Sequence, residues 1–164
     1  MPFHLNLTCY IRFRPDYIHV RNVQHGLDIE CLPWIAFDKK GWRPKVLEVG
    51  DEARQLKGST PDITVTNPFA HPRMLISDFT PAVLLIRHLI GRALSRERFF
   101  SPHPVVILHP DVSPEGGFTE IELRAMRELC LGAGARHSKG WQGRPLEDAE
   151  LLGKALPADG VILW

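Results

Sequence analysis

The sequence predicts an α/β domain in which a mixed β-sheet is flanked by helices. Three observations lead to this fold class. Residues 105–108 are four consecutive aliphatic side chains between two prolines, which is typical of a strand buried on both faces. Thr119 and Glu122 then form a Ser/Thr-x-x-Glu capping box that starts a helix. Residues 3–13 alternate between apolar and polar side chains, as in a strand with one covered face.

The N-terminal part is predicted to form three consecutive antiparallel strands. The first strand, residues 3–13, and the second, residues 17–23, are joined by a tight turn at residues 14–16. A second turn leads into a third strand, residues 27–37, which contains Pro33. Strands that follow one another through such short turns pair as a meander.

Residues 38–77 are predicted to form an excursion from this sheet, made of a hairpin and a loop. A lysine-rich turn at residues 38–41 returns through residues 45–49 and is followed by a short helix at residues 50–56. The rest of the excursion is rich in proline and glycine, which indicates a surface loop, with one short strand at residues 63–66.

Two amphipathic helices are predicted in the second half. Thr80 as the N-cap and Pro81 at the first helical position predict a helix that runs to about residue 98. The helix that begins after the capping box is predicted to turn Ile121, Ala125 and Leu129 toward the core, with Met126 and Cys130 beside them.

The C-terminal segment is less regular in its pattern. Gly132 and Gly134 end the capped helix, because glycine adopts the left-handed conformation at little cost. Residues 136–144 carry no clear period. Residues 145–156 are predicted to form a last helix, and residues 161–164 a short terminal strand.

Composition indicates one folded domain spanning residues 1–164. Twenty Lys and Arg against nineteen Asp and Glu leave a formal charge of +1, which gives no argument for a nucleic-acid partner. Cys9, Cys31 and Cys130 are widely spaced and form no CxxC motif, which favours reduced thiols in a cytoplasmic protein. We expect no signal peptide, and no apolar stretch approaches the ~20 residues that a membrane span needs.

Three stretches resemble one known family. They are residues 35–61 (IAFDKKGWRPKVLEVGDEARQLKGSTP), residues 76–94 (ISDFTPAVLLIRHLIGRAL) and residues 105–136, which begin VVILHP and end AGAR. The bacterial actin-like rod-shape proteins, the MreB family, carry closely similar motifs: a lysine-rich hairpin before a V-G-x-x-A helix, an I-x-D-F helix start, and a T-E-x-E-x-R-A-x-R-E helix. The resemblance covers most of residues 27–136 and implies the N-terminal lobe of that family, a ribonuclease-H-like (actin-like ATPase lobe) unit.

The resemblance also implies nucleotide-binding elements, from which this sequence departs. The family has an Asp and a Gly-Thr-rich phosphate loop between its first two strands; here residues 8–16 contain no glycine and Thr8 replaces the Asp. The family's Glu-Glu-Pro, whose carboxylate helps to orient the attacking water, is Gly143-Arg144-Pro145 here. Its second phosphate loop belongs to a second half, and residues 159–164 fall about where that half would begin. We therefore expect no ATP cofactor and no ATPase activity.

Thr8, His109, Asp111 and Arg144 are the candidates for a vestigial site. His109 and Asp111 follow the central strand at its carboxyl end, where α/β proteins usually place their ligands. His103 precedes the same strand, roughly 20 Å from His109 at the rise of an extended chain, so the two cannot share a metal ion through the strand alone. No catalytic, cofactor-binding or metal-binding residue is predicted.

Trp42, Trp141 and Trp164 are the candidates for a protein interface. Trp42 falls at the tip of the predicted hairpin and Trp164 at the last position, and neither has an obvious core to enter. Exposed aromatic side chains favour a protein partner or self-association, while burial of each one is an open alternative.

These observations predict a non-catalytic interaction or scaffold module related to the bacterial cell-shape cytoskeleton, acting with a protein partner or as a homodimer. One alternative is an ATP-dependent actin-like protein whose site is completed by a partner chain. Another is a divergent enzyme of the ribonuclease-H-like fold. A nuclease of that fold needs carboxylates on its first strand to hold two Mg²⁺ ions, and the first strand here has none.

Overall fold

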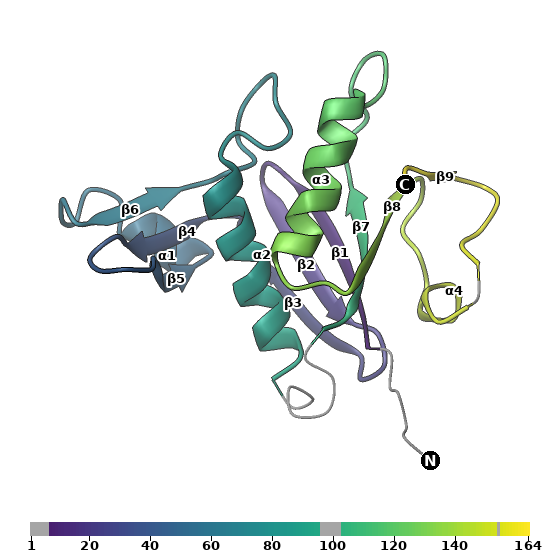
Figure 1. Ribbon diagram of the computed structural model, residues 1–164, viewed down its shortest axis with the longest axis horizontal. Helices are drawn as coiled ribbons and strands as arrows, with labels where there is room; N and C mark the ends of the chain where they lie inside the picture. The colour runs from purple at the N-terminus through teal and green to yellow at the C-terminus, as the bar shows by residue number, and fades with distance from the viewer. Residues whose placement is uncertain (1–6, 96–102, 154) are drawn as a thin grey trace.

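The computed structural model describes residues 7–95, 103–153 and 155–164, which form two β-sheets and the helices that cover them (Figure 1). The large sheet has six strands in the order β3-β2-β1-β7-β8-β9, and the small sheet has three in the order β5-β4-β6. The large sheet contains β1 (Thr8–Arg14), β2 (Tyr17–Asn22), β3 (Leu27–Cys31), β7 (Val105–Pro110), β8 (His137–Gln142) and β9 (Val161–Ile162). The small sheet contains β4 (Ile35–Asp38), β5 (Lys45–Val49) and β6 (Ile63–Thr66).

The large sheet is mixed, as predicted. Strand β7 pairs in parallel with β1 on one side and β8 on the other, while the remaining pairs are antiparallel. Its central residues Val106, Ile107 and Leu108 are buried, which confirms the prediction of a strand covered on both faces. Residues 136–144, which had no clear pattern, contain β8.

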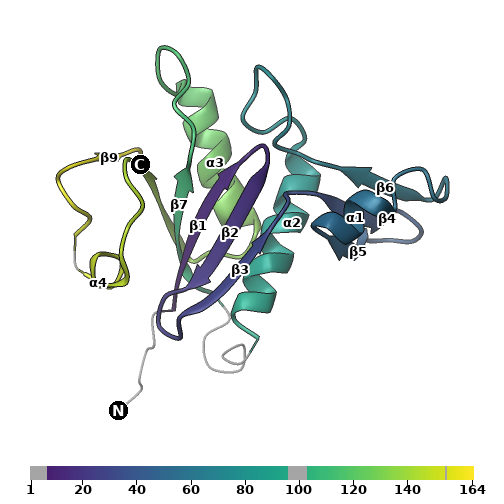
Figure 2. The same ribbon diagram turned by 180° about the vertical axis from the view of Figure 1, so that it is seen from behind.

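Helices α2 (Phe79–Ala93) and α3 (Glu120–Gly132) cover one face of the large sheet. In Figure 1 they lie in front of the strands, and in Figure 2 the strands lie in front of them. The main core forms between these layers, from strand residues such as Cys9, Ile11 and Leu108 and from helix residues such as Leu89 and Leu129. Burying these aliphatic faces is the main source of stability for the layered arrangement.

The capping box of α3 is confirmed, but the predicted buried face is partly wrong. The Thr119 hydroxyl accepts from the Glu122 N–H at 3.2 Å, and the Thr119 N–H donates to Glu122 Oε2 at 2.8 Å. The core face carries Met126, whereas Ile121 is 81% exposed. At 3.6 residues per turn these two side chains point about 140° apart, so only one of them can face the sheet.

The predicted strand at residues 27–37 is wrong, because the chain leaves one sheet and enters the other within it. Strand β3 ends at Cys31, and β4 begins at Ile35 as the central strand of the small sheet. Between them the Trp34 N–H donates to the Leu32 carbonyl at 2.8 Å, which closes a tight turn around Pro33. Proline cannot donate to a sheet ladder, so the strand is interrupted there.

The predicted excursion otherwise contains the elements expected of it. The hairpin returns through β5, a short helix α1 (Asp51–Gln55) follows, and β6 pairs with β4. These elements lie together at one end of the molecule, beside α2 (Figure 1).

Helix α2 has other ends than predicted. Asp78 is its N-cap, so Pro81 occupies the third helical position, where the missing N–H is still harmless because the first turn has no carbonyl partners. The helix ends at Ala93 with Leu94 as C-cap, so the predicted extension is wrong at residues 94–95. The rest of that extension, residues 96–98, lies outside the described residues, as do residues 3–6 of the first predicted strand.

The segment after β8 covers the other face of the sheet, as a loop with one short helix. Helix α4 (Asp148–Leu151) is much shorter than the predicted helix at residues 145–156, because Glu147 caps it and the chain turns away at Leu152. The segment buries Leu146 and Leu151 against Tyr10, Ile107 and Trp141, which forms a second, smaller core. Strand β9 then returns antiparallel to β8. Among the described residues, none of the helices has the length and apolar character needed to cross a bilayer.

Candidate functional site

The carboxyl ends of β1 and β7 lie side by side, and the polar residues there form the candidate site. The parallel register pairs Arg12 with His109. Asp111 is the first residue after β7, and its backbone N–H donates to the Phe13 carbonyl at 2.9 Å. The structure therefore places His109 and Asp111 at the same end of the sheet and sets Arg12 beside them. Sequence reasoning missed Arg12 because a parallel register between strands about 100 residues apart leaves no local signal.

His109 is buried and forms a relay with Tyr10. Its side chain is 1% exposed, and Nδ1 lies 2.6 Å from the Tyr10 hydroxyl. The Leu146 N–H donates to that hydroxyl at 3.1 Å, so the phenolic proton is available for Nδ1. The other ring nitrogen then carries the proton and bonds the Gly143 backbone. The relay fastens the loop after β8 to the centre of the sheet.

The pKa of His109 is lowered mainly by burial and also by nearby Arg12, while Asp111 and the Gly143 carbonyl oppose this shift. Below about pH 6.5 the unfolded chain binds a proton that the folded chain rejects, so stability should be flat above that pH and should decrease below it. The measurement is the midpoint of urea unfolding at about pH 7.5 and at about pH 5.0, which lie above and below the usual histidine pKa.

His109→Gln should reduce this pH dependence, while a matched change of the exposed His137 to Gln should preserve it. A smaller slope should persist in His109→Gln, because burial also lowers the pKa of His88. An unchanged slope in His109→Gln would contradict the assignment of the buried neutral imidazole.

Arg12 and Asp111 form an ion pair next to this relay. Arg12 Nη2 and Asp111 Oδ2 are 2.8 Å apart, and the two side chains are 22% and 30% exposed. The adjoining β1–β2 turn contains Arg14, which pairs with Asp16 at 2.7 Å and stacks on the Tyr17 ring with its guanidinium 5.3 Å from the ring centre. The turn is therefore occupied by bulky side chains that contact one another.

Arg144 holds a second charged cluster, at the start of the loop after β8. It donates to both carboxylate oxygens of Glu150 and, at 2.8 Å, to Asp159. The bond from Arg144 is the main reason that the pKa of Glu150 is lowered to about 2. Arg144 thus ties α4 to the chain before β9, and its partners are carboxylates of this same chain.

Thr8 does not belong to the site. It lies at the start of β1, in register with Val105, whereas His109 and Asp111 lie at the other end of β7. Its backbone N–H donates to Gln24 Oε1 at 2.9 Å. The prediction that grouped Thr8 with His109 and Asp111 is therefore wrong: Thr8 was placed there by its resemblance to the family's Asp, and it lies at the opposite end of β1 from the β1–β2 turn.

The three interface candidates have different surroundings. Trp141 is 0% exposed, and its indole N–H donates to the Arg144 carbonyl at 2.9 Å, so the prediction of an interface role for this side chain is wrong. Trp164 is half-buried against the main core, and its N–H donates to Ser138 at 3.0 Å. Trp42 is 93% exposed at the tip of the β4–β5 hairpin. Trp42 is the one of the three that is fully available to a partner.

Metal-binding geometry is absent from the described part of the chain, in which no three His, Cys, Asp or Glu side chains cluster around a common point. His103 lies before β7 and contacts the Gly134 carbonyl at 3.2 Å, at the opposite end of the strand from His109.

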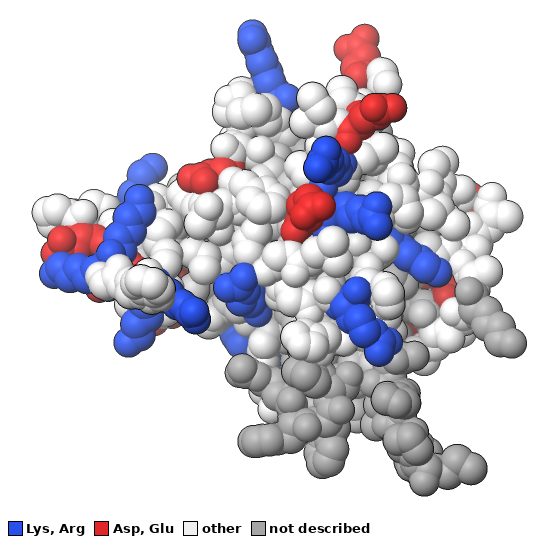
Figure 3. All heavy atoms as spheres, viewed as in Figure 1, with Lys and Arg blue, Asp and Glu red and all other residues white. Residues whose placement is uncertain are grey.

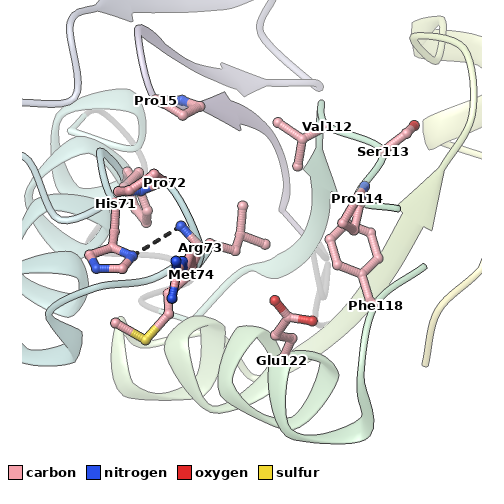
Figure 4. A pocket seen from close by; sticks show the side chains of 12 residues that line it. Pro15, His71, Pro72, Arg73, Met74, Val112, Ser113, Pro114, Phe118 and Glu122 are labelled. Atoms are coloured by element: carbon pink, nitrogen blue, oxygen red, sulfur yellow. Dashed lines mark hydrogen bonds between the residues drawn. The ribbon is translucent and has the colours of Figure 1, made fainter. Parts of the chain in front are cut away.

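A small hollow beside the β1–β2 turn was not predicted from the sequence. Its volume is about 240 Å³, somewhat below the ~300–1,000 Å³ of typical ligand pockets. Figure 4 shows His71, Pro72, Arg73 and Met74 on one side and Val112, Ser113, Pro114 and Phe118 on the other. Apolar side chains dominate the hollow, and these come from loops whose packing the sequence pattern does not reveal.

The mixed sheet and its covering helices define an actin-like fold. Two solved structures have this fold: MreB5 of Spiroplasma citri bound to ADP (TM-score 0.60, 18% identity, 82% of this chain and 37% of that chain), and a non-polymerising mutant of MamK bound to AMPPNP (TM-score 0.57, 12% identity, 84% and 41%). At these identities the likeness concerns the fold alone.

The chain belongs to the MreB/Mbl protein family, which it matches over residues 24–141. It is 35% identical over 120 residues to the cell shape-determining protein MreB of Escherichia coli (strain K12), covering 73% of this chain and 33% of that protein. It is 27% identical over 121 residues to the cell shape-determining protein Mbl of Bacillus subtilis (strain 168), with the same coverage. The chain spans about a third of the length of these curated relatives.

Proposed function

We propose that this chain is a non-catalytic, actin-like interaction or scaffold module related to the bacterial cell-shape cytoskeleton, without ATP-handling elements. The observation that carries the proposal is the state of the candidate site. Arg12 and Asp111 neutralise each other, and His109 is buried and bonded to Tyr10. A phosphate group needs exposed backbone amides and unpaired cationic side chains. At the candidate site, the cationic side chain of Arg12 is already paired with a carboxylate of the same chain.

The extent of the family match supports the same proposal. The match spans residues 24–141 and leaves out β1, the β1–β2 turn and the segment that follows β8. By resemblance, those are the two places in this chain where the family's first phosphate loop and its Glu-Glu-Pro would lie. The matched region and the two departing segments are thus separate parts of the chain, as expected of a lobe without ATP-handling elements.

The enzyme alternatives need groups that this site does not offer. Two-metal hydrolysis needs several carboxylates around one point, and in the described site Asp111 is ion-paired with Arg12. A site completed by a partner chain would need Arg12 and Arg144 released from their carboxylates before they could meet a phosphate. Both alternatives predict measurable ligand binding, whereas the scaffold proposal predicts none.

Titration with ATP and Mg²⁺ should leave the thermal midpoint of the purified chain unchanged and should release no binding heat. A competent site at 100-fold saturation would stabilise the fold by about 2.7 kcal/mol, which is a shift of several degrees for a domain of this size. A shift of that size would overturn the proposal in favour of the ATP-dependent alternative. Titration with Mg²⁺ alone is the control for the metal-dependent enzyme.

The surface that we assign to a protein partner or to a second copy is the tip of the β4–β5 hairpin. Trp42 is exposed there and is surrounded in sequence by Lys39, Lys40, Arg43 and Lys45. Figure 3 shows Lys and Arg gathered at the end of the molecule that the small sheet forms. An exposed indole flanked in sequence by cationic residues fits an acidic partner surface with an apolar centre. Light scattering on the wild type and on Trp42→Ala distinguishes self-association, in which only the wild type is a dimer, from binding to a different protein.

A further inference from the structure

Two open sheet edges line one groove beside helix α2. Strand β3 is the edge of the large sheet and β5 is the edge of the small sheet. Figure 2 shows β3 on the side of the large sheet that faces α1 and β5. The groove between them has a volume of about 480 Å³, and it is lined by residues 29–31 of β3, residues 47–49 of β5, Glu52 of α1, and His88 and Arg92 of α2. An edge strand leaves one row of backbone N–H and C=O groups without a sheet partner.

The two edges differ in how well they could accept another strand. All five residues of β3 are in continuous register with β2. Strand β5 has a bulge, because Ala36 pairs with Glu48 and Phe37 with Val46, which leaves Leu47 unpaired. A bulge twists an edge and interrupts its row of hydrogen-bonding groups. Strand β3 is therefore the edge that is open to pairing.

The charge of the groove is acidic. Glu48 and Glu52 line it, and Arg92 is the one fixed cation among the described lining residues. Glu30 also borders the groove, but its side chain points to the opposite face of β3 from Ile29 and Cys31 and accepts from the Tyr17 hydroxyl. His88 is neutral at pH 7, because burial lowers its pKa. Within the described part of the chain, Glu48 forms no ion pair and no side-chain hydrogen bond. Its one described electrostatic neighbour in the groove is His88, whose pKa it raises against the larger effect of burial, so the carboxylate is available to a ligand. A cationic side chain would complement this groove.

The floor of the groove is apolar and suits an alternating peptide. Ile29 and Cys31 are half-buried and pack against the main core, and Val49 is buried beside them. An extended peptide points every second side chain to the same face. A segment with small or β-branched residues toward the floor and Lys or Arg toward the carboxylates would match both features.

We propose that this groove binds an extended, basic segment of another protein, which adds as a further strand to the free edge of β3 and places a Lys or Arg between Glu48 and Glu52. Backbone hydrogen bonds to β3 provide the affinity, and the carboxylates select the positive charge. The groove is separate from Trp42, so this inference does not depend on the hairpin interface.

The test uses the whole chain and a fluorescent hexapeptide, Thr-Lys-Val-Lys-Val-Thr, with binding followed by fluorescence anisotropy. Two further peptides carry backbone N-methyl groups at either the odd or the even positions. Because alternate N–H groups of a strand point to opposite edges, one N-methylated peptide should bind at least about tenfold more weakly, and the other should bind like the parent. The protein is unaltered in this comparison, so misfolding cannot produce the result.

Charge selection is tested with Glu48→Lys and with a peptide in which Glu replaces Lys. The variant should bind the lysine peptide about tenfold more weakly and gain affinity for the glutamate peptide. Glu115→Lys, an exposed change in the loop before α3, is the matched control and should leave both affinities unchanged. The proposal would be overturned if both N-methylated peptides lost affinity equally, or if the wild type bound the glutamate peptide more tightly than the lysine peptide. It would also be overturned if the lysine peptide showed no binding at about 1 mM. Dissociation of a dimer by the peptide would also overturn it, by assigning the groove to a second copy of the chain.

Discussion

Trp141→Ala should lower the free energy of unfolding by about 3–5 kcal/mol, as is typical when a large aromatic side chain is removed from a core. Trp141 is 0% exposed and forms the centre of the second core with Tyr10 and Leu151. A methyl group placed on Gly160 would come within 2.3 Å of the Trp141 ring, so the chain that covers the ring is closely packed against it. Alanine would leave a cavity that this covering segment cannot fill by small movements.

Urea unfolding followed by circular dichroism measures this loss, with an expected decrease of the midpoint of about 2 M at the usual slopes. Trp42→Ala is the matched control, because it removes the same side chain at a site that is 93% exposed. Its effect should stay within about 0.5 kcal/mol. Equal effects of the two substitutions would contradict the assignment of Trp141 to the core and of Trp42 to the surface.

Tyr10→Phe should cost about 3 kcal/mol, although it keeps the aromatic ring. The substitution removes the hydroxyl that bonds His109 Nδ1 and accepts from the Leu146 N–H. Two buried groups then lack partners, and each such group costs about 1–3 kcal/mol. The same loss should loosen the loop from Gly143 to Leu146, which amide hydrogen exchange at Leu146 would detect.

Tyr17→Phe provides the control for this prediction. The Tyr17 hydroxyl donates to Glu30 at 3.2 Å on the exposed part of the same sheet face, where water can replace it. We expect the free energy of unfolding of this control to lie within about 0.5 kcal/mol of the wild-type value. A Tyr10→Phe variant as stable as Tyr17→Phe would mean that the relay does not hold the loop, and that hydrophobic burial alone fastens it.

Patterns that are complete within a few residues of sequence predicted their structures correctly. The aliphatic run of β7, the capping box of α3, the short helix after β5 and the strand at residues 63–66 all form as expected. Each is decided by local backbone preferences and by side-chain bonds between near neighbours, so distant parts of the chain have little influence on it.

Predictions that needed the partners of a residue were less successful. Ile121 follows the helical period but faces solvent, because α3 docks through the other predicted residues Met126, Leu129 and Cys130. Pro33 divides an apparently continuous strand into β3 and β4, which belong to different sheets. The local sequence pattern does not predict which strands β4 will pair with. For the candidate site, sequence reasoning found His109 and Asp111 but included Thr8 and omitted Tyr10 and Arg12.

The sequence by itself determined the fold class and the family, since these depend on residue types and on their order. Only the tertiary structure decided which residues share the site. The parallel register of β1 with β7 sets Arg12 beside His109, and the loop after β8 closes over Tyr10 and buries Trp141. Registers and coverings of this kind depend on contacts between residues far apart in the chain, and no local pattern encodes them.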